Sequence, residues 1–216
     1  MAHRDVTVAQ AMNARQMANK KGVGASRWQK ALDEKIGGFS TFLDAVRSGR
    51  RIVVESDLVV PEGGRIVELP GLRVNQGQEW QAAINAAGPN TPENYNARKV
   101  GDLYLPTSTG IKKKDFVLLN FGPKGGSWER ALAWGCQYPQ LKRSVPRDVF
   151  AVGKAKPELH RELGMDPMYL VATTECAFDG GQRACGVWWG GAVREAGLYW
   201  VSDFGGACVW FLFSRE

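Results

Sequence analysis

Four cysteines and two histidines are the residues of this chain that could bind a metal or act as nucleophiles. No two cysteines have the two-to-four-residue spacing typical of a zinc site. Cys176 and Cys185 flank a turn and could form a catalytic or copper-binding pair, but no histidine stands near them in the sequence. We therefore predict no metal and no cofactor. We interpret the cysteines as buried free thiols, and they are Cys136, Cys176, Cys185 and Cys208.

Sequence motifs for common enzymatic chemistry are missing. The chain contains no GxSxG, no phosphate-binding loop, no HExxH and no GxGxxG. Asp179 and Asp203 are isolated carboxylates of the kind found in turns. The sequence therefore predicts a protein that is not an enzyme.

The carboxyl-terminal stretch from Cys185 to Phe213 mixes large aromatic residues with small ones. It holds four of the eight tryptophans, Trp188, Trp189, Trp200 and Trp210, separated mainly by Gly, Ala, Val and Ser. Tryptophan buries a large area, whereas glycine adds no packing and costs backbone entropy. Two interpretations follow: core strands joined by glycine turns, or a rigid aromatic frame whose small residues face a ligand.

The composition is that of a globular protein. The chain has 216 residues, of which 44% are hydrophobic and 23% charged, enough for one large or two small domains. It contains no apolar run of bilayer length and no apolar signal segment near its start. We therefore expect no membrane span, and either a cytoplasmic location or association with a virion or cell surface by a non-classical route.

The net charge of +6 is unevenly distributed. Residues 170–216 carry three arginines and five carboxylates, a net −2, so residues 1–169 carry +8. Nucleic-acid binders place basic and aromatic residues on one surface. Their separation here disfavours a nucleic-acid partner, although the basic region keeps that alternative open.

Hydrophobic periodicity predicts helices first and then mostly strands. The first 48 residues predict three helices, and we assign residues 1–48 to a helical segment and 49–216 to one domain. Helices are expected over 5–20, 26–38, 41–49, 77–88 and 157–163. Strands are expected over 50–56, 57–60, 64–70, 72–75, 100–106, 115–122, 168–178, 187–189, 196–201 and 208–213. Residues 127–134 are expected to form a turn or extended segment, and 140–167 a long surface loop around the short helix. This order predicts an α+β fold with short, mostly antiparallel strands.

The segment FDGGQRACGVWWGGAVREAGLYWVSDFGGACVWFLFSRE resembles the variable region of proteins diversified by retroelements. The Gly-Gly-Ser-Trp at 125–128 is similar to a segment that precedes this region in several such proteins. The resemblance is clearest over residues 168–216 and looser over 100–167. It implies a C-type lectin-like fold with a mutated ligand-binding surface at about 179–216. The implied partner is a protein or cell-surface molecule, and the oligomeric state stays open.

Residue types in this region agree with that resemblance. Randomising the adenines of an AAC codon cannot produce Trp, Lys, Gln, Met or Glu. Between Ala184 and Ser214, only the four tryptophans and Glu195 are residues that such a codon cannot encode. This separates fixed tryptophans from small residues that are free to vary.

Strand alternation and the expected loops then give the ligand-binding positions. Leu198, Trp200 and Trp210 are expected to point inward, with truncation of either tryptophan costing about 3–5 kcal/mol. Tyr199 and Asp203 are expected to make the strongest contacts. The predicted binding residues are Gly181, Ala184, Gly186, Gly190, Gly197, Tyr199, Ser202, Asp203, Gly205, Gly206, Ala207 and Cys208.

The chain departs from sugar-binding C-type lectins in its calcium ligands. It lacks the Glu-Pro-Asn, Gln-Pro-Asp and Trp-Asn-Asp motifs. The resemblance therefore implies a lectin-like shape that serves another ligand. A relative of the formylglycine-generating enzymes, with a reactive Cys176 and Cys185, is the enzymatic alternative.

Overall fold

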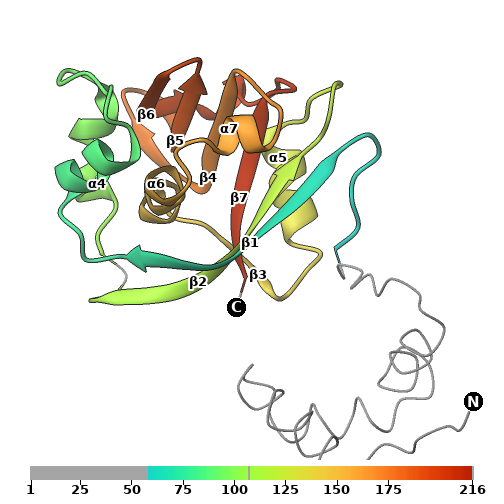
Figure 1. Cartoon of the computed structure of the whole chain (residues 1–216), viewed down its shortest axis with the longest axis horizontal. Coiled ribbons are helices and arrows are strands. Elements are labelled where there is room, and N and C mark those ends of the chain that lie inside the picture. The colour runs from blue at the N-terminus through green and yellow to red at the C-terminus, as the bar shows by residue number, and fades with distance from the viewer. Residues whose placement is uncertain (1–57, 107, 216) are drawn as a thin grey trace, which may run out of the picture. The chain divides into compact units, whose positions relative to one another are not determined.

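A mixed, open seven-stranded sheet forms the centre of the protein in the computed structural model (Figure 1), which describes residues 58–106 and 108–215. The strand order is β1-β2-β7-β4-β5-β6, with β3 also pairing with β7. The strands are β1 (Arg65–Asn75), β2 (Ile111–Asn120), β3 (Leu141–Arg143), β4 (Met168–Phe178), β5 (Gly181–Gly190), β6 (Val193–Trp200) and β7 (Val209–Arg215).

Strand β7 occupies the middle of the sheet and pairs with three other strands. It runs antiparallel to β2 and β3 but parallel to β4. Its continuous apolar run, Val209–Phe213, is buried along its whole length, as expected for a strand covered on both faces. All other strand pairs are antiparallel, so the predicted antiparallel pairing is right except at β4–β7.

Four helices and three short 3-10 turns complete the α+β fold within the described residues. The α-helices are α4 (Trp80–Ala87), α5 (Trp128–Gly135), α6 (Pro146–Ala155) and α7 (Leu159–Glu162), and the 3-10 turns are η1 (Asn96–Lys99), η2 (Gly101–Leu103) and η3 (Val201–Asp203). Each longer helix begins at a recognisable cap. The carboxylate of Glu79 accepts from the amides of Gln81 and Ala82, and the Ser127 hydroxyl accepts from the amide of Arg130.

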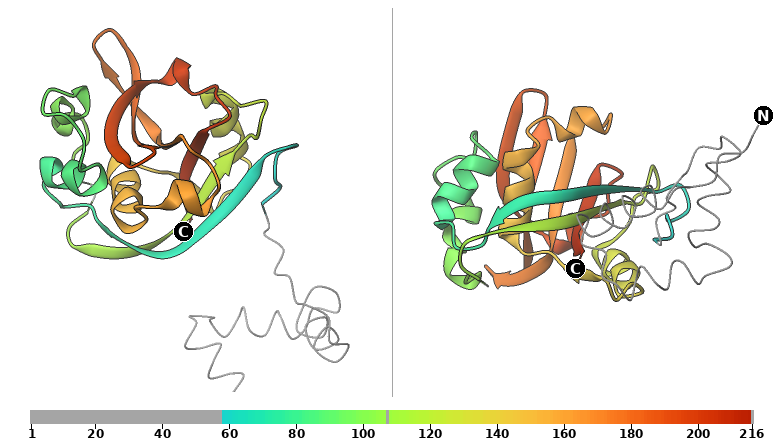
Figure 2. Two further views of the ribbon diagram at one scale, coloured as in Figure 1. Left: turned by 45° about the horizontal axis from the view of Figure 1, so that its top comes forward. Right: turned by 60° about the horizontal axis from the view of Figure 1, so that its bottom comes forward.

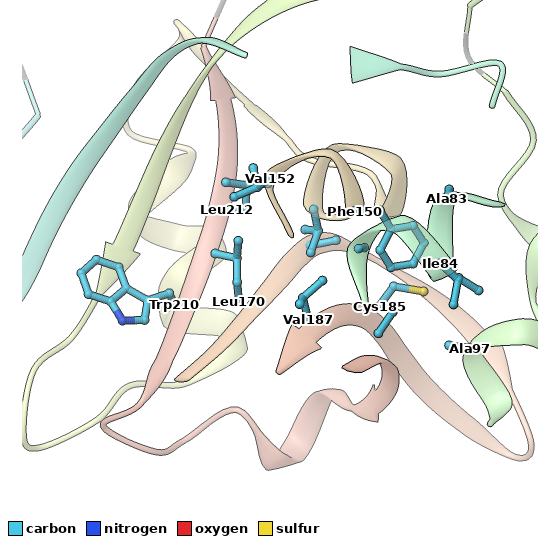
Figure 3. Packing of buried hydrophobic residues seen from close by; sticks show 14 of the residues in the cluster. Ala83, Ile84, Ala97, Phe150, Val152, Leu170, Cys185, Val187, Trp210 and Leu212 are labelled. Atoms are coloured by element: carbon cyan, nitrogen blue, oxygen red, sulfur yellow. The ribbon is translucent and has the colours of Figure 1, made fainter. Parts of the chain in front are cut away.

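The two faces of the sheet carry separate hydrophobic clusters. On one face, α4 and α6 pack against Leu170, Cys185, Val187 and Leu212, as Figure 3 shows. We call this the helix face. On the opposite face, α5 packs against Val117, Phe211 and Phe213, covering β2 and β7. We call this the α5 face, and Figure 2 shows the layers from two further directions.

Some elements follow the predictions closely. Strand β4 has the predicted bounds, 168–178, and α4 lies within the predicted helix over 77–88. The three expected carboxyl-terminal strands correspond to β5, β6 and β7. Hydrophobic periodicity was sufficient for each of these because their apolar residues occupy the core.

Other predictions were wrong. Residues 128–135 form helix α5 instead of an extended segment, because Ser127 caps the helix and Trp128, Ala131 and Trp134 share its buried side. Residues 146–155 form the buried helix α6, not a surface loop. Proline at the first helical position favours a helix start, and Asp148 accepts from the Val145 amide at 3.0 Å.

Two further segments differ. Residues 100–106 contain the 3-10 turn η2 instead of a strand, and 58–60 are not in a strand. The predicted helices over 5–20, 26–38 and 41–49, and the strand over 50–56, lie outside the described residues, as does the proposed boundary at 48/49. The described residues belong to one compact unit that begins at Leu58.

Candidate functional site

A row of polar aromatic and acidic side chains crosses the α5 face beyond the part that α5 covers. Strand pairing aligns Val209 of β7 with Tyr169, Tyr169 with Trp188, and Trp188 with Glu195. The Tyr95 hydroxyl donates a hydrogen bond of 3.0 Å to Glu195 Oε2 at the end of this row. Because directly opposed residues in a sheet share a face, these side chains form one continuous surface.

Tyr199 lies next to this row and completes what we call the aromatic face, made of Tyr95, Tyr169, Trp188, Glu195 and Tyr199. Its ring meets Tyr169 edge to face, with 5.5 Å between centroids. Tyr169, Trp188, Glu195 and Tyr199 are half-buried, and Tyr95 is exposed. Aromatic rings held in this way offer contact area at a low entropic cost.

Three glycines form the floor under these rings. A β-carbon at Gly197 would overlap the end of the Tyr199 ring, and one at Gly190 would overlap the Trp188 ring. At Gly186 a β-carbon would come within 2.7 Å of the Leu170 carbonyl oxygen and 3.3 Å of the Tyr199 ring. Because these three positions carry no side chain, the rings can lie flat against the sheet.

The segment between β6 and β7, residues 201–208, forms the rim of a pocket beside the aromatic face. We call it the rim loop. Its pocket has a volume of about 190 Å³ and is lined by Tyr169, Tyr199, Asp203, Phe204, Gly206, Cys208 and Val209. The pocket is smaller than the 300–1,000 Å³ typical of whole-ligand sites. It is the right size for one side chain of a larger partner.

Phe204 anchors the rim loop to the body of the protein. Only 2% of it is exposed, and its ring stacks on Trp128 at 5.7 Å and meets Tyr199 at 6.2 Å. The residues around it, Ser202, Asp203 and 205–207, are exposed. The loop therefore combines a fixed aromatic centre with accessible tips.

The Gly-Gly-Ser-Trp segment supports the same loop from the other side. Gly125 has a positive φ of 67°, and a β-carbon there would overlap the carbonyl oxygen of Gly205. Ser127 caps α5, and Trp128 then reaches Phe204. This places residues 125–128 in direct contact with the rim loop.

Burial controls the protonation of the tyrosines. Desolvation, followed by the neighbouring Tyr169, raises the pKa of Tyr199. Desolvation, followed by Cys208, also raises the pKa of Tyr169, while the hydrogen bond to Glu195 raises the pKa of Tyr95. All three therefore remain neutral phenols near neutral pH, able to donate hydrogen bonds.

The structure places the predicted binding residues in different surroundings. Tyr199, Asp203, Gly206 and Cys208 line the pocket, and Ser202, Gly205 and Ala207 are exposed on the rim loop. Ala184 is fully buried on the α5 face, and Gly186, Gly190 and Gly197 form the floor beneath the rings. Gly181 lies apart from the pocket at the start of β5, where a β-carbon would overlap the Trp200 ring.

Trp200 does not have the buried position that was predicted. Its side chain is 38% exposed, and the Arg183 guanidinium lies 3.3 Å from its ring centroid. Leu198 and Trp210 are buried as expected. Alternation places Trp200 on the same side of β6 as Leu198, but it does not give the exposure of the side chain.

Sequence reasoning missed Tyr95, Tyr169 and Glu195. Tyr169 follows Met168 and precedes Leu170, two buried residues, and a polar aromatic at such an alternate position indicates the other face of the strand. Tyr95 reaches the face from a loop, so no periodicity could have placed it. Phe204 is not among the predicted binding residues, although it anchors the rim loop.

The cysteines have different environments. Cys185 is fully buried on the helix face, and burial raises the pKa of its thiol well above the usual value. Cys176 and Cys208 are half-buried, and Cys136 is exposed, so the prediction of four buried thiols was right only for Cys185. Nucleophilic cysteines require a lowered thiol pKa, which Cys185 does not have. Within the described part of the chain, no group of three or more Cys, His, Asp or Glu residues is positioned to hold a metal.

No protein family, curated protein or solved structure matches this chain at a significant level. Across residues 58–106 and 108–215, no helix has the length and apolar character needed to cross a membrane.

Proposed function

We propose that this protein is a non-enzymatic binding protein of C-type lectin-like fold, whose rim loop and aromatic face recognise a protein or cell-surface ligand. We further propose that a retroelement diversifies this surface, as the sequence resemblance implies. The observation that carries the proposal is the pocket beside the aromatic face. Four residues predicted from sequence to contact a ligand line it together with Tyr169 and the anchored Phe204.

The surface has the features of a recognition site. Tyrosine and tryptophan dominate binding energy at protein interfaces because they combine large area with a polar end. The aromatic face and the pocket lining include two carboxylates, Glu195 and Asp203, and no basic residue. We therefore expect the preferred ligands to present a basic or amide side chain that enters the pocket.

The structure of the surface suggests which positions tolerate variation. Ser202, Asp203 and residues 205–207 are exposed, so changes there alter contacts without entering the core. Gly186 and Gly197 tolerate little while Tyr199 lies over them. Diversification would therefore act chiefly on the rim loop and on Tyr199, with Phe204 and Trp128 held constant.

A selection experiment tests the binding proposal. The immobilised full chain is panned against a random peptide phage library, and enriched peptides are measured against Asp203→Asn and Tyr199→Ala variants. We expect enrichment of basic peptides and at least about tenfold weaker binding to either variant, since charged hydrogen bonds and aromatic anchors each contribute 1.4 kcal/mol or more. The matched control is Asp102→Asn, which changes an acidic residue of η2 and not of the pocket. Equal binding to all variants would show that the surface is not the recognition site.

The genome provides a separate test of diversification. We expect a reverse-transcriptase gene nearby and a near-copy of the 3′ coding segment that differs at adenines. Substitutions among related copies should concentrate in codons for 199–208 and spare Phe204. Substitutions spread evenly through β5, β6 and β7 would contradict retroelement diversification while leaving the binding proposal to the peptide selection.

A further inference from the structure

A large cavity lies on the helix face, away from the aromatic face. It has a volume of about 710 Å³, within the range of small-molecule sites, and is formed by β1, α4 and α6. Its lining includes Arg73, Ala83, Ala86, Arg147, Phe150 and Lys154.

One face of helix α6 forms a wall of the cavity. Arg147, Phe150, Ala151, Lys154 and Ala155 are spaced i, i+3, i+4, i+7 and i+8, which places them on one side of a helix. Phe150 is 2% exposed. The alanines of this face stand across the cavity from Ala83 and Ala86 of α4, and small side chains on both helices leave the space open.

A buried cation stands in this wall. Arg147 is 8% exposed, and its guanidinium lies 5.1 Å from the Trp80 ring centroid. It donates to the carbonyl oxygens of Gln78 at 3.3 Å and Tyr104 at 2.5 Å. Its acidic neighbour is Glu79, whose two carboxylate oxygens accept from the amides that begin α4. No described carboxylate forms an ion pair with Arg147, whose charge is compensated by the two carbonyl oxygens, the Trp80 ring and the more distant Glu79.

Two more cations border the same space. Lys154 lies two helical turns from Arg147, and Arg73 belongs to β1. Both residues are exposed, and within the described chain neither side chain makes a hydrogen bond or an ion pair. The lining includes no aspartate and no glutamate. A lining that combines Phe150 and several alanines with three cations and no acidic residue favours an anion that carries an apolar body.

We propose that this cavity binds a small amphipathic organic acid. Its apolar chain or ring would lie against Phe150 and the alanines of α4 and α6, and its carboxylate would lie near Arg147 and Lys154. This site is independent of the recognition surface, since it lies on the opposite side of the sheet and shares no lining residue with the pocket of the rim loop.

Titration of the full chain with octanoate, followed by calorimetry, tests this assignment. The neutral control is 1-octanol, which has the same chain length. We expect one octanoate per chain and at least about tenfold weaker binding of octanol, because charged hydrogen bonds contribute at least 1.4 kcal/mol. Octanol binding as tightly as octanoate, or no binding of octanoate, would overturn the proposal.

Matched variants locate the binding. Ala86→Leu fills the cavity and should weaken octanoate binding about tenfold or more, whereas Ala82→Leu, at an exposed position of the same helix, should leave it unchanged. Lys154→Gln should weaken binding about two- to fivefold, as for an exposed ion pair. Lys124→Gln, in an exposed turn, is its control. Thermal melts confirm that each variant folds, and unchanged binding to a folded Ala86→Leu protein would show that octanoate binds elsewhere.

Discussion

Replacing Gly197 with alanine should expel the Tyr199 ring from its place on the sheet. The new β-carbon would overlap the ring's Cζ and Oη atoms. Since these atoms form the end of a half-buried side chain, the ring can swing outward and the backbone can stay in place. The variant should therefore fold, but with a distorted pocket.

The size of the effect follows from the contacts that Tyr199 would lose. Its ring forms two edge-to-face pairs, with Tyr169 at 5.5 Å and Phe204 at 6.2 Å. Such pairs contribute about 0.5–1.5 kcal/mol each. Replacing glycine by alanine regains about 0.4–1 kcal/mol through the unfolded chain. We expect a net loss of about 1–2 kcal/mol in the free energy of unfolding.

Alanine substitutions at two other glycines give stability changes for comparison. Gly186→Ala should cost more, about 3 kcal/mol, because its β-carbon would lie 2.7 Å from the backbone oxygen of Leu170, which cannot move without disturbing strand pairing. Gly205→Ala should cost less than about 0.5 kcal/mol, since its nearest contact would be 3.4 Å away. Urea unfolding monitored by tryptophan fluorescence would measure both changes.

A double-mutant cycle decides whether the Tyr199 ring is the cause. In a Tyr199→Ala background, the Gly197→Ala substitution should become neutral or stabilising, giving a coupling energy of about 1–2 kcal/mol. An equal cost of Gly197→Ala in both backgrounds would refute the inference that the glycine exists to accommodate the ring.

Three further outcomes follow from burial. Trp210→Ala should lower the free energy of unfolding by about 3–5 kcal/mol because Trp210 is fully buried, whereas Trp200→Ala should lower it by only about 1 kcal/mol. Urea unfolding measures both changes, and equal losses would contradict the exposure of Trp200. A thiol reagent should modify the exposed Cys136 rapidly in the native protein and Cys185 only on unfolding, and rapid native labelling of Cys185 by mass spectrometry would revive the enzymatic alternative. Burial raises the folded-state pKa of Tyr199 above its unfolded value, so the stability that neutral Tyr199 contributes should be complete below about pH 10 and should decrease by about 1.4 kcal/mol per pH unit above pH 10. Tyr199→Phe should therefore flatten the pH dependence of the free energy of unfolding between about pH 10 and 11. An unchanged slope in this variant would contradict the raised pKa.

Local patterns predicted the elements whose side chains enter the core. The apolar stripe of 77–88 gave α4 because Trp80, Ala83, Ile84 and Ala87 all pack against the sheet. Strand β4 had a continuous β-branched and apolar run bounded by Pro167 and Asp179. In such segments the periodicity of the sequence and the demands of burial coincide.

The missed elements required information from outside the segment. Helix α6 begins with a proline and contains Arg147 and Asp148, which look like surface residues until the fold buries both of them. Parallel pairing of β4 with β7 joins residues far apart in the chain, and no local pattern specifies it. Tertiary context decided these cases.

The candidate site differs from the sequence prediction mainly in the role of its glycines. Small residues between tryptophans indicated a surface in the last forty residues, and the rim loop lies there. The sequence could not show that Gly186, Gly190 and Gly197 serve the rings of neighbouring residues. Whether a glycine is an open position or a support depends on which side chain lies over it.

The central place of β7 has a consequence for synthesis on the ribosome. Translation proceeds from the amino end, so β2 and β4 emerge well before the residues, 209–215, that must insert between them. Until then, two partial sheets expose unpaired edges next to each other, a condition that favours aggregation. We expect nascent chains stalled before residue 209 to require chaperone protection, and folding to be completed only after the segment has left the exit tunnel.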